Sequence, residues 1–389
     1  MSQGGSSAGT GAERGGARDV RFGLVGYGAW GACHARAIAT HARLTAVCAA
    51  TESTRQRARE ALPSSTAICR DYGELVARDD VDVVDVVVPN ALHREVALAA
   101  LAAGKHLLLE KPMATTVADA QAIATAARER NRCLAIGHEA RLSPQWRKVK
   151  QLAESGAIGQ PLTAAIHLSR FPYRLGASGW RYDPQRVGDW TLEEPIHYFD
   201  LLRWFLAPRG APLSIYACAN SARPDERPGL HDNLATLVTF PGDAYATLTH
   251  TLAAYEYHLR GEVVGTGGVV RTWWSGEMDR TERPRFACEY FDGRQKHEVT
   301  LESTPGELFE LETEIEAMAH WVATGERPNA LATGEDGIWA VRLCLAAEES
   351  AHRGASVPLV GAEGDGAEGD GADEAKAAGT AGAQALGGR

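Results

Sequence analysis

Residues 24–31 read LVGYGAWG and place Gly26, Gly28 and Gly31 in a GxGxxG pattern. The pattern follows a short apolar run, VRFGLV (20–25), which predicts a strand, and it opens a helical segment at 31–40. In this setting Gly26 permits a tight turn, Gly28 leaves the backbone open to close approach, and Gly31 allows close helix–strand packing. We therefore predict a strand, a glycine turn and a helix over the first 20 residues of an ordered domain.

Strand and helix signals continue to alternate as far as residue 137. Apolar runs predict further strands at 43–50, 81–89, 105–110 and 133–138. Helical patterns occupy 53–62, 91–104 and 115–130. This alternation predicts parallel strands joined by right-handed crossovers, which is a doubly wound Rossmann sheet.

A glycine turn at the start of such a sheet is typical of a dinucleotide site. The helix N-terminus offers N–H donors and the positive end of the helix dipole to a pyrophosphate. The residues predicted to line it are Gly26, Gly28, Ala29, Trp30 and Gly31. The alternative is a glycine-rich turn without a ligand, which the strand–turn–helix context disfavours.

The end of the second strand bears on the choice between NAD and NADP. Ala49 and Ala50 stand where a ribose-binding carboxylate is usual, and the nearest acid is Glu52. Ser53 and Arg55, with the neighbouring threonine, offer groups suited to a 2′-phosphate. The sequence leaves both cofactors open and favours NADP slightly.

The pattern changes after Arg141. A helical segment is followed by strand-like runs of alternating polarity with hairpin-type turns, which predict a largely antiparallel sheet with one covered face, and two long helices close the ordered part. The expected organisation is a disordered leader (1–19), a nucleotide-binding domain (20–137), an α+β substrate and oligomerisation domain (138–360) and a disordered Gly/Ala-rich tail (361–389).

The composition of the chain indicates which binding partners and which cellular compartment to expect. The 389 residues carry a formal net charge of -10 without a dominant basic cluster, so neither nucleic acid nor an anionic membrane is an expected partner. No apolar run approaches the ~20 residues of a membrane helix. Seven scattered cysteines without a CxxC pair predict reduced thiols and a cytoplasmic protein.

Polar residues stand where two predicted strands end. Glu110 ends the run at 105–110 and is followed by Lys111 and a proline, and Pro89 ends the run at 81–89 and is followed by Asn90 and His93. Ligands of a doubly wound sheet lie beyond the carboxyl ends of its strands. A lysine there can bind a substrate hydroxyl and favour its alkoxide. An exposed Glu–Lys pair is the plainer interpretation of this motif when it is considered alone.

The motif does not stand alone. LLLEKPMA, together with GYGAWG, VVVPNALHREVALAALAAGKH and GDWTLEEPIHYFDLLRWFL, resembles the Gfo/Idh/MocA family of glucose–fructose oxidoreductases and inositol dehydrogenases over roughly residues 20–360. The resemblance implies a Rossmann domain, an open, mostly antiparallel second sheet, and NAD(P)-dependent oxidation of a secondary alcohol of a sugar, inositol or polyol, or the reverse reduction. It implies that Lys111 touches the reacting hydroxyl, that Glu110 orients the ribose or Lys111, and that Asn90 and His93 lie by the nicotinamide ribose.

The family's second motif, Asp-x-Gly-x-His, corresponds here to residues 193–197, EEPIH. His197 fits a general acid/base, because its ordinary pKa lies near neutrality. Glu193 replaces the aspartate and Pro195 the glycine, which leaves the chemistry plausible and the substrate open. One alternative is that Glu193 and His197 ligate a metal ion, but no third ligand with suitable spacing is evident, so no metal is expected. The other is that His197 makes a structural hydrogen bond at the start of the helix.

Cationic and aromatic residues around the motif predict a polar substrate pocket. Those expected to contact the substrate are Arg141, Arg170, Tyr173 and Tyr255, with Lys111, Glu193 and His197. Trp180 and Arg181 are expected beside the cofactor. For any one of them, ordinary packing or a solvated cation is the plainer interpretation.

The predicted reaction passes the substrate's hydride to the nicotinamide while His197 takes the hydroxyl proton and Lys111 stabilises charge on oxygen. One rival keeps the cofactor bound and recycles it, which gives net hydrolysis, elimination or epimerisation through a ketone. Another is a nucleotide-binding regulator without turnover, and imine reduction is a further option. An open sheet with an exposed apolar face also predicts a homodimer or homotetramer.

Overall fold

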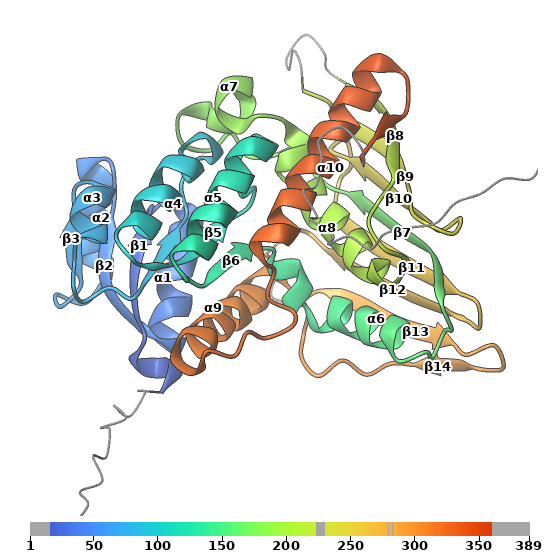
Figure 1. The fold of residues 1–389 in the computed structure, drawn as a ribbon, viewed down its shortest axis with the longest axis horizontal. Coiled ribbons are helices and arrows are strands. Elements are labelled where there is room, and N and C mark those ends of the chain that lie inside the picture. The colour runs from blue at the N-terminus through green and yellow to red at the C-terminus, as the bar shows by residue number, and fades with distance from the viewer. Residues whose placement is uncertain (1–15, 223–229, 279, 282, 360–389) are drawn as a thin grey trace, which may run out of the picture.

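The computed structural model describes residues 16–222, 230–278, 280–281 and 283–359. Two β-sheets stand side by side, and the long helix α10 (Gly334–Arg353) runs between them (Figure 1). The predicted leader and tail fall mostly outside the described residues. The exception is Ala17–Asp19, a 3-10 turn that packs on α9 (Glu307–Thr324), so helical structure begins before the predicted boundary at residue 20. In the described part of the chain, no helix combines the length and apolar character needed to cross a membrane.

The first sheet has six parallel strands in the order β3-β2-β1-β4-β5-β6, which confirms the predicted doubly wound fold. Its strands are β1 (Arg21–Val25), β2 (Arg43–Cys48), β3 (Ala67–Cys69), β4 (Val83–Val86), β5 (His106–Glu110) and β6 (Leu134–Gly137). The helices that join them are α1 (Ala29–His41), α2 (Glu52–Ala61), α3 (Tyr72–Val76), α4 (His93–Ala102) and α5 (Val117–Glu129).

The surroundings of β5 explain why this strand carries three consecutive leucines instead of alternating apolar and polar residues. Leu107 and Leu109 pack with apolar side chains of α4 and α5, whereas Leu108 points to the opposite face, among side chains of α1 and α9. Successive side chains of a strand alternate between faces, so a strand covered on both sides is apolar at every position. The polar residues Glu110 and Lys111 therefore stand where the buried strand ends.

The second sheet has nine strands in the order β14-β13-β12-β11-β7-β10-β9-β8-β15, and only β7 and β10 pair in parallel among the pairs described. This confirms the predicted, mostly antiparallel sheet. The strands are β7 (Pro161–Ser169), β8 (Ser214–Asn220), β9 (Asn233–Thr239), β10 (Tyr245–Thr251), β11 (Tyr257–Gly265), β12 (Val269–Gly276), β13 (Arg285–Phe291), β14 (Lys296–Glu298) and β15 (Val357–Pro358).

Helices cover one face of this second sheet. Helix α8 (Pro195–Phe205) lies on β7 and β10, and α6 (Pro144–Glu154) lies on β11 and β12. The short helix α7 (Pro184–Val187) and two 3-10 turns, η4 (Ala177–Tyr182) and η5 (Trp190–Leu192), lead into α8. The opposite face carries exposed large apolar side chains, namely Tyr216, Leu237, Tyr245, Trp273 and Phe291.

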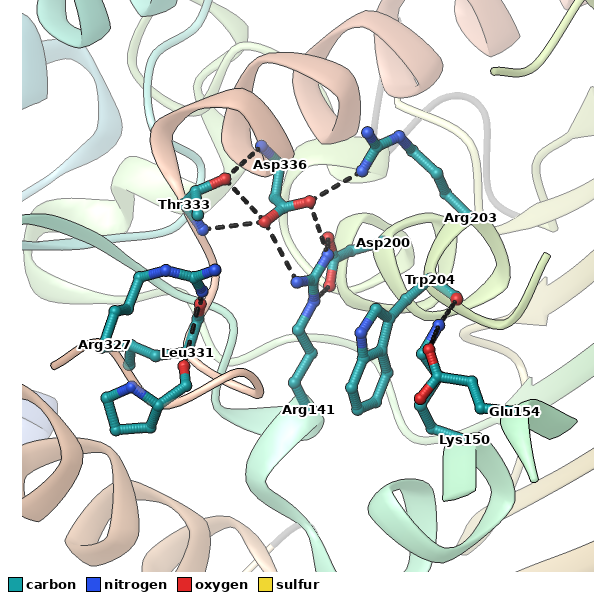
Figure 2. A network of polar contacts seen from close by, with 11 residues as sticks. Arg141, Lys150, Glu154, Asp200, Arg203, Trp204, Arg327, Leu331, Thr333 and Asp336 are labelled. Atoms are coloured by element: carbon teal, nitrogen blue, oxygen red, sulfur yellow. Dashed lines mark hydrogen bonds and ion pairs between the residues drawn. The ribbon is translucent and has the colours of Figure 1, made fainter. Parts of the chain in front are cut away.

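Arg141 joins three elements of the second half of the molecule, the 3-10 turn η3 (Glu139–Leu142) and the helices α8 and α10. It follows β6 in η3, is 2% exposed, and donates to both carboxylate oxygens of Asp200 on α8, at 2.6 and 2.7 Å (Figure 2). It also donates to Asp336 at the start of α10, at 3.1 Å. The guanidinium is therefore committed to a buried ion-pair network. This corrects the expectation that Arg141 contacts the substrate, because its charge is needed to neutralise two carboxylates between packed helices.

Candidate active site

The glycine turn has the geometry that a pyrophosphate site requires. Gly26 has φ 107°, and a Cβ there would lie 1.9 Å from the carbonyl oxygen of Val87. A Cβ on Gly31 would lie 2.0 Å from the Gly26 carbonyl oxygen, so both positions need glycine. A Cβ on Gly28 would meet nothing within 4 Å, which leaves open space at the N-terminus of α1. The residues present fit a dinucleotide whose phosphates approach Gly28 and the first N–H groups of the helix.

Glu110 lies at the centre of a buried polar chain. Its Oε1 accepts hydrogen bonds from Trp30 Nε1 at 2.8 Å and from His34 Nε2 at 3.0 Å, and His34 Nδ1 lies 2.8 Å from Asp85 Oδ2. Burial alone would lower the pKa of His34, but Asp85 and Glu110 raise it well above its ordinary value. The imidazolium in turn helps to keep the pKa of Glu110 low despite burial. Trp30 is thus a contact of Glu110, and His34 is a residue that the sequence analysis missed.

Lys111 emerges from the end of β5 toward the second half of the molecule. The bond from Lys111 to Pro112 is cis, and Lys111 Nζ donates to the backbone oxygen of Glu193 at 2.7 Å. Burial would lower the pKa of Lys111, but neighbouring carboxylates, led by Glu193 and Glu110, raise it overall. The side chain is therefore an ammonium fixed at the junction of the two sheets.

Glu193 directs its carboxylate away from His197. Its Oε1 accepts from Asn90 Nδ2 at 3.2 Å and its Oε2 from Arg181 Nε at 2.8 Å. The guanidinium of Arg181 stacks over the ring of Trp180, with its central carbon 4.9 Å from the ring centroid. Residues predicted for the cofactor and for catalysis thus meet in one hydrogen-bonded set. Asn90 follows Pro89 at the end of β4, in the 3-10 turn Asn90–Leu92.

His93 does not face this set. It is fully buried, and its ring nitrogens lie 2.6 Å from the Pro112 carbonyl oxygen and 2.9 Å from the Val88 carbonyl oxygen. Burial lowers the pKa of His93, so the neutral ring donates to one of these two carbonyl oxygens, and its enclosure by backbone groups corrects the expectation of a cofactor contact. The ring instead links the ends of β4 and β5.

A cavity of about 90 Å³ opens beside Lys111. His197 lies on its wall, in the first turn of α8, where Pro195 occupies the first helical position. Carboxyl groups and aromatic rings make up much of the remaining wall. The other lining residues that bear on chemistry are Glu139, Ser143, Trp146, Glu194, Tyr198, Tyr257, Trp274, Glu307 and Glu310.

The environment of His197 keeps its imidazole neutral. The residue is 7% exposed, and burial, followed by the charge of Lys111, lowers its pKa well below the ordinary value. Its Nε2 lies 3.7 Å from Glu139 Oε1, and its Nδ1 has no hydrogen-bond partner among the described residues. Burial raises the pKa of Glu139 well above its usual range, with Glu110 nearby. An imidazole with a lowered pKa and a carboxyl group with a raised pKa thus stand next to each other.

Glu194, rather than Glu193, presents its carboxylate to the cavity. Its Oε1 accepts from Tyr257 at 2.6 Å and its Oε2 forms an ion pair with Arg170. Arg170 in turn lies over the ring of Tyr173, which is buried, and neither residue lines the cavity. Tyr255, predicted for the substrate, is 80% exposed and does not line the cavity.

The residues that the sequence analysis missed have simple signals. Tyr255 lies in the bend before β11, whereas Tyr257 is the first residue of that strand, so the choice of tyrosine depended on where the strand begins. Glu139 follows β6 at the same sheet edge as Lys111, which is a position that strand-end reasoning can identify.

The first turn of α2, which follows the end of β2, carries an arginine that is already paired. Arg55 donates to Glu52 Oε2 at 2.8 Å, and also to the backbone oxygens of Ala49 and Ala50. The hydroxyl of Ser53 lies beside the N-terminus of α2, where Thr51 is the cap. This surface offers hydroxyls, N–H groups and a cation.

Comparisons with known proteins agree with this geometry. Residues 20–138 match the model of the oxidoreductase family GFO_IDH_MocA, NAD-binding Rossmann fold, and residues 146–271 match a GFO/IDH/MocA C-terminal domain. A 1,5-anhydro-D-fructose reductase of Ensifer adhaerens is 31% identical over 74% of this chain and 82% of its own length. An inositol 2-dehydrogenase of Acidothermus cellulolyticus is 32% identical over 65% of this chain and 72% of its own.

The fold agrees as well. The crystal structure of an aldose-aldose oxidoreductase from Caulobacter crescentus, complexed with glycerol, superposes with a TM-score of 0.75 at 23% identity and covers 88% of this chain and 100% of its own. With its glycine turn, its Glu110–Lys111–Pro112 strand end and these matches across both halves, the chain belongs to the Gfo/Idh/MocA family of oxidoreductases.

Proposed function

We propose that the protein transfers a hydride between a nicotinamide dinucleotide and a secondary alcohol or ketone of a sugar, inositol or related polyol. The observation that carries the proposal is that Lys111, at the end of β5, and His197, in the first turn of α8, line one cavity at the carboxyl ends of the Rossmann strands. The two relatives are named for reactions on an anhydro-sugar and on inositol, which supports a polyol-type substrate.

The cavity wall favours an uncharged, hydroxyl-rich ligand. Glu194, Glu307 and Glu310 offer carboxyl groups that accept hydrogen bonds from hydroxyls and repel anions. Trp146 and Trp274 supply flat apolar surface for the C–H faces of a ring. A sugar or cyclitol presents both kinds of surface, whereas a phosphate ester would meet several carboxylates.

Each polar residue then has one task. When bound, the nicotinamide would accept or supply the hydride at the substrate carbon. The neutral imidazole of His197 accepts the hydroxyl proton during oxidation, and the Lys111 ammonium stabilises negative charge that develops on the same oxygen. Glu193 holds Asn90 and Arg181 while its backbone oxygen fixes Lys111 Nζ. Glu139 Oε1 lies 3.7 Å from His197 Nε2, so a water molecule between them would let the two exchange a proton.

NADP is the cofactor that we favour. The end of β2 has alanines in place of a ribose-binding acid, and Ser53 and Arg55 lie by the N-terminus of α2, where a 2′-phosphate would gain a cation and N–H donors. Glu52 already accepts hydrogen bonds from the guanidinium of Arg55, so the preference for NADP over NAD is modest.

The decisive test is a screen of sugars, glycosides and inositols with NAD and NADP, read as absorbance of the reduced nicotinamide. Lys111→Met is expected to lower kcat by roughly 100- to 1,000-fold, as for loss of one charge-stabilising donor, while cofactor Kd stays within a few-fold. Lys148→Met is the matched control, because Lys148 is half-buried, does not line the cavity, and donates its one printed hydrogen bond among the described residues to Gln151. Normal turnover in Lys111→Met would refute the assignment. Substrate conversion without net reduced cofactor would instead favour internal recycling.

The exposed apolar side chains of the second sheet support association of two copies through that face. Tyr216 and Leu237 pair across β8 and β9 and are each 41% exposed. Sedimentation velocity of wild type and of Tyr216→Ser/Leu237→Ser tests this, since a double variant that sediments like the wild type would exclude this face.

A further inference from the structure

Three side chains of the types that bind metal ions in proteins lie close together outside the cavity. Asp189 precedes η5, His231 precedes β9, and Glu348 lies in the last turns of α10. One ligand atom from each lies within 4.8 Å of the other two, and His231 Nδ1 is 3.5 Å from Glu348 Oε2. None of them lines the cavity beside Lys111.

The carboxylate of Glu348 lacks the partners that burial demands. The residue is 8% exposed, and neither of its oxygens has a hydrogen-bond donor among the described residues. The buried Nδ1 of His231 is also without a hydrogen-bond partner there. A buried carboxylate without a donor is costly and is normally compensated by a proton or a cation.

We propose that Asp189, His231 and Glu348 bind a divalent transition-metal ion, with Zn²⁺ as the best fit. Two carboxylates balance a 2+ charge, and a neutral imidazole nitrogen is a preferred zinc ligand. Zn–N and Zn–O bonds of about 2.0–2.1 Å at tetrahedral angles separate ligand atoms by about 3.3 Å, close to the observed 3.5 Å between His231 and Glu348. Ca²⁺ and Mg²⁺ fit less well, because they require six or more oxygen ligands or retained waters.

The ion would act as a clamp within the second half of the molecule. Asp189 lies on the segment that leads into Glu193, Glu194 and α8, and Glu348 lies on α10, which packs against η5 and β8 (Figure 1). Binding joins three segments far apart in the chain, so it stabilises the folded state by mass action.

The test uses untagged, chelator-treated full-length protein and needs no enzyme assay. Zn²⁺ is titrated against a competing chromophoric chelator, and thermal unfolding is followed with and without equimolar Zn²⁺. One saturable equivalent per chain and a higher Tm with Zn²⁺ are expected. Glu348→Gln and His231→Gln are each expected to weaken binding by roughly 100-fold and to abolish the Tm shift. Glu349→Gln, an exposed neighbour paired with Arg353, keeps both.

Two outcomes would overturn the site. Wild type without a saturable equivalent would show that Asp189 and Glu348 share a proton instead of a cation. Equal Zn²⁺ affinity of wild type and both ligand variants would place the bound zinc elsewhere, for example on thiols. Because His231 is half-buried, His231→Gln serves as the folded test variant if circular dichroism shows that Glu348→Gln is unfolded. A parallel titration with Mn²⁺ that bound tighter than Zn²⁺ would overturn the choice of metal.

Discussion

Replacing Arg141 by methionine should destabilise the protein severely while leaving substrate recognition intact. Methionine keeps an aliphatic stem beside Trp204, whose ring centroid lies 5.3 Å from the guanidinium carbon, and removes only the charge and its donors. Asp200 is 1% exposed and has no other hydrogen-bond donor to its carboxylate among the described residues, so it would be left as an unpaired buried charge. Asp336 would keep three donors, two from Thr333 and one from Arg203 (Figure 2).

The magnitude follows from which carboxylate is stranded. Breaking a buried ion pair from one side costs about 3–5 kcal/mol, and the isolation of Asp200 places Arg141→Met within that range. Arg203→Gln is the matched control. Its side chain is 22% exposed, lies over the ring of Trp339 and donates to one oxygen of Asp336, which Arg141 continues to neutralise, so a loss of about 1 kcal/mol is expected.

Urea unfolding followed by tryptophan fluorescence gives the midpoint and slope for each variant. Steady-state kinetics on the folded fraction gives KM, which should stay within about 2-fold of wild type because Arg141 lies outside the cavity. The double variant Arg141→Met/Asp200→Asn should be more stable than Arg141→Met alone, since it removes the stranded charge. A stable Arg141→Met protein with a greatly raised KM would refute the structural role and restore the substrate contact predicted from the sequence.

Three further predictions concern the site. Glu139→Gln should lower kcat by roughly 10-fold, which is less than the loss expected when a general acid or base itself is removed. An unchanged solvent isotope effect on kcat in this variant would rule out proton exchange between Glu139 and His197. The kcat for oxidation should not fall near pH 6.5 as the pH decreases, because burial lowers the pKa of His197 and keeps the base neutral there. The pH profile is measured in the Glu310→Gln variant, since burial raises the pKa of Glu310 in the same cavity to about 7. A fall in kcat centred at pH 6.5 in that variant would contradict a neutral His197. Glu52→Gln should tighten NADP binding about 3-fold relative to NAD by releasing the exposed partner of Arg55, and fluorescence titration showing no change in the NADP/NAD ratio would refute a role for Arg55 in selecting the phosphate.

Local patterns were sufficient for the first half of the molecule. The glycine turn, the leucine run of β5 and the strand–helix alternation specify a doubly wound sheet, because backbone sterics, burial on both faces and crossover handedness are all readable within short segments. The same logic placed Lys111 at a strand end, since parallel strands bring their carboxyl ends to one edge.

Only the tertiary structure decided how side chains distant in sequence are paired. From their positions in the sequence, Arg141 and His93 are both expected in the cleft. In the structure Arg141 instead pairs with Asp200 and Asp336, and the ring of His93 lies against backbone carbonyl groups. The direction of the Glu193 carboxylate depended on Asn90 and Arg181, which a sequence motif does not include. Short-range sterics and hydrophobic periodicity are local and leave a trace in sequence. The partner of a buried charge is set by packing between segments up to about 200 residues apart and leaves no local trace.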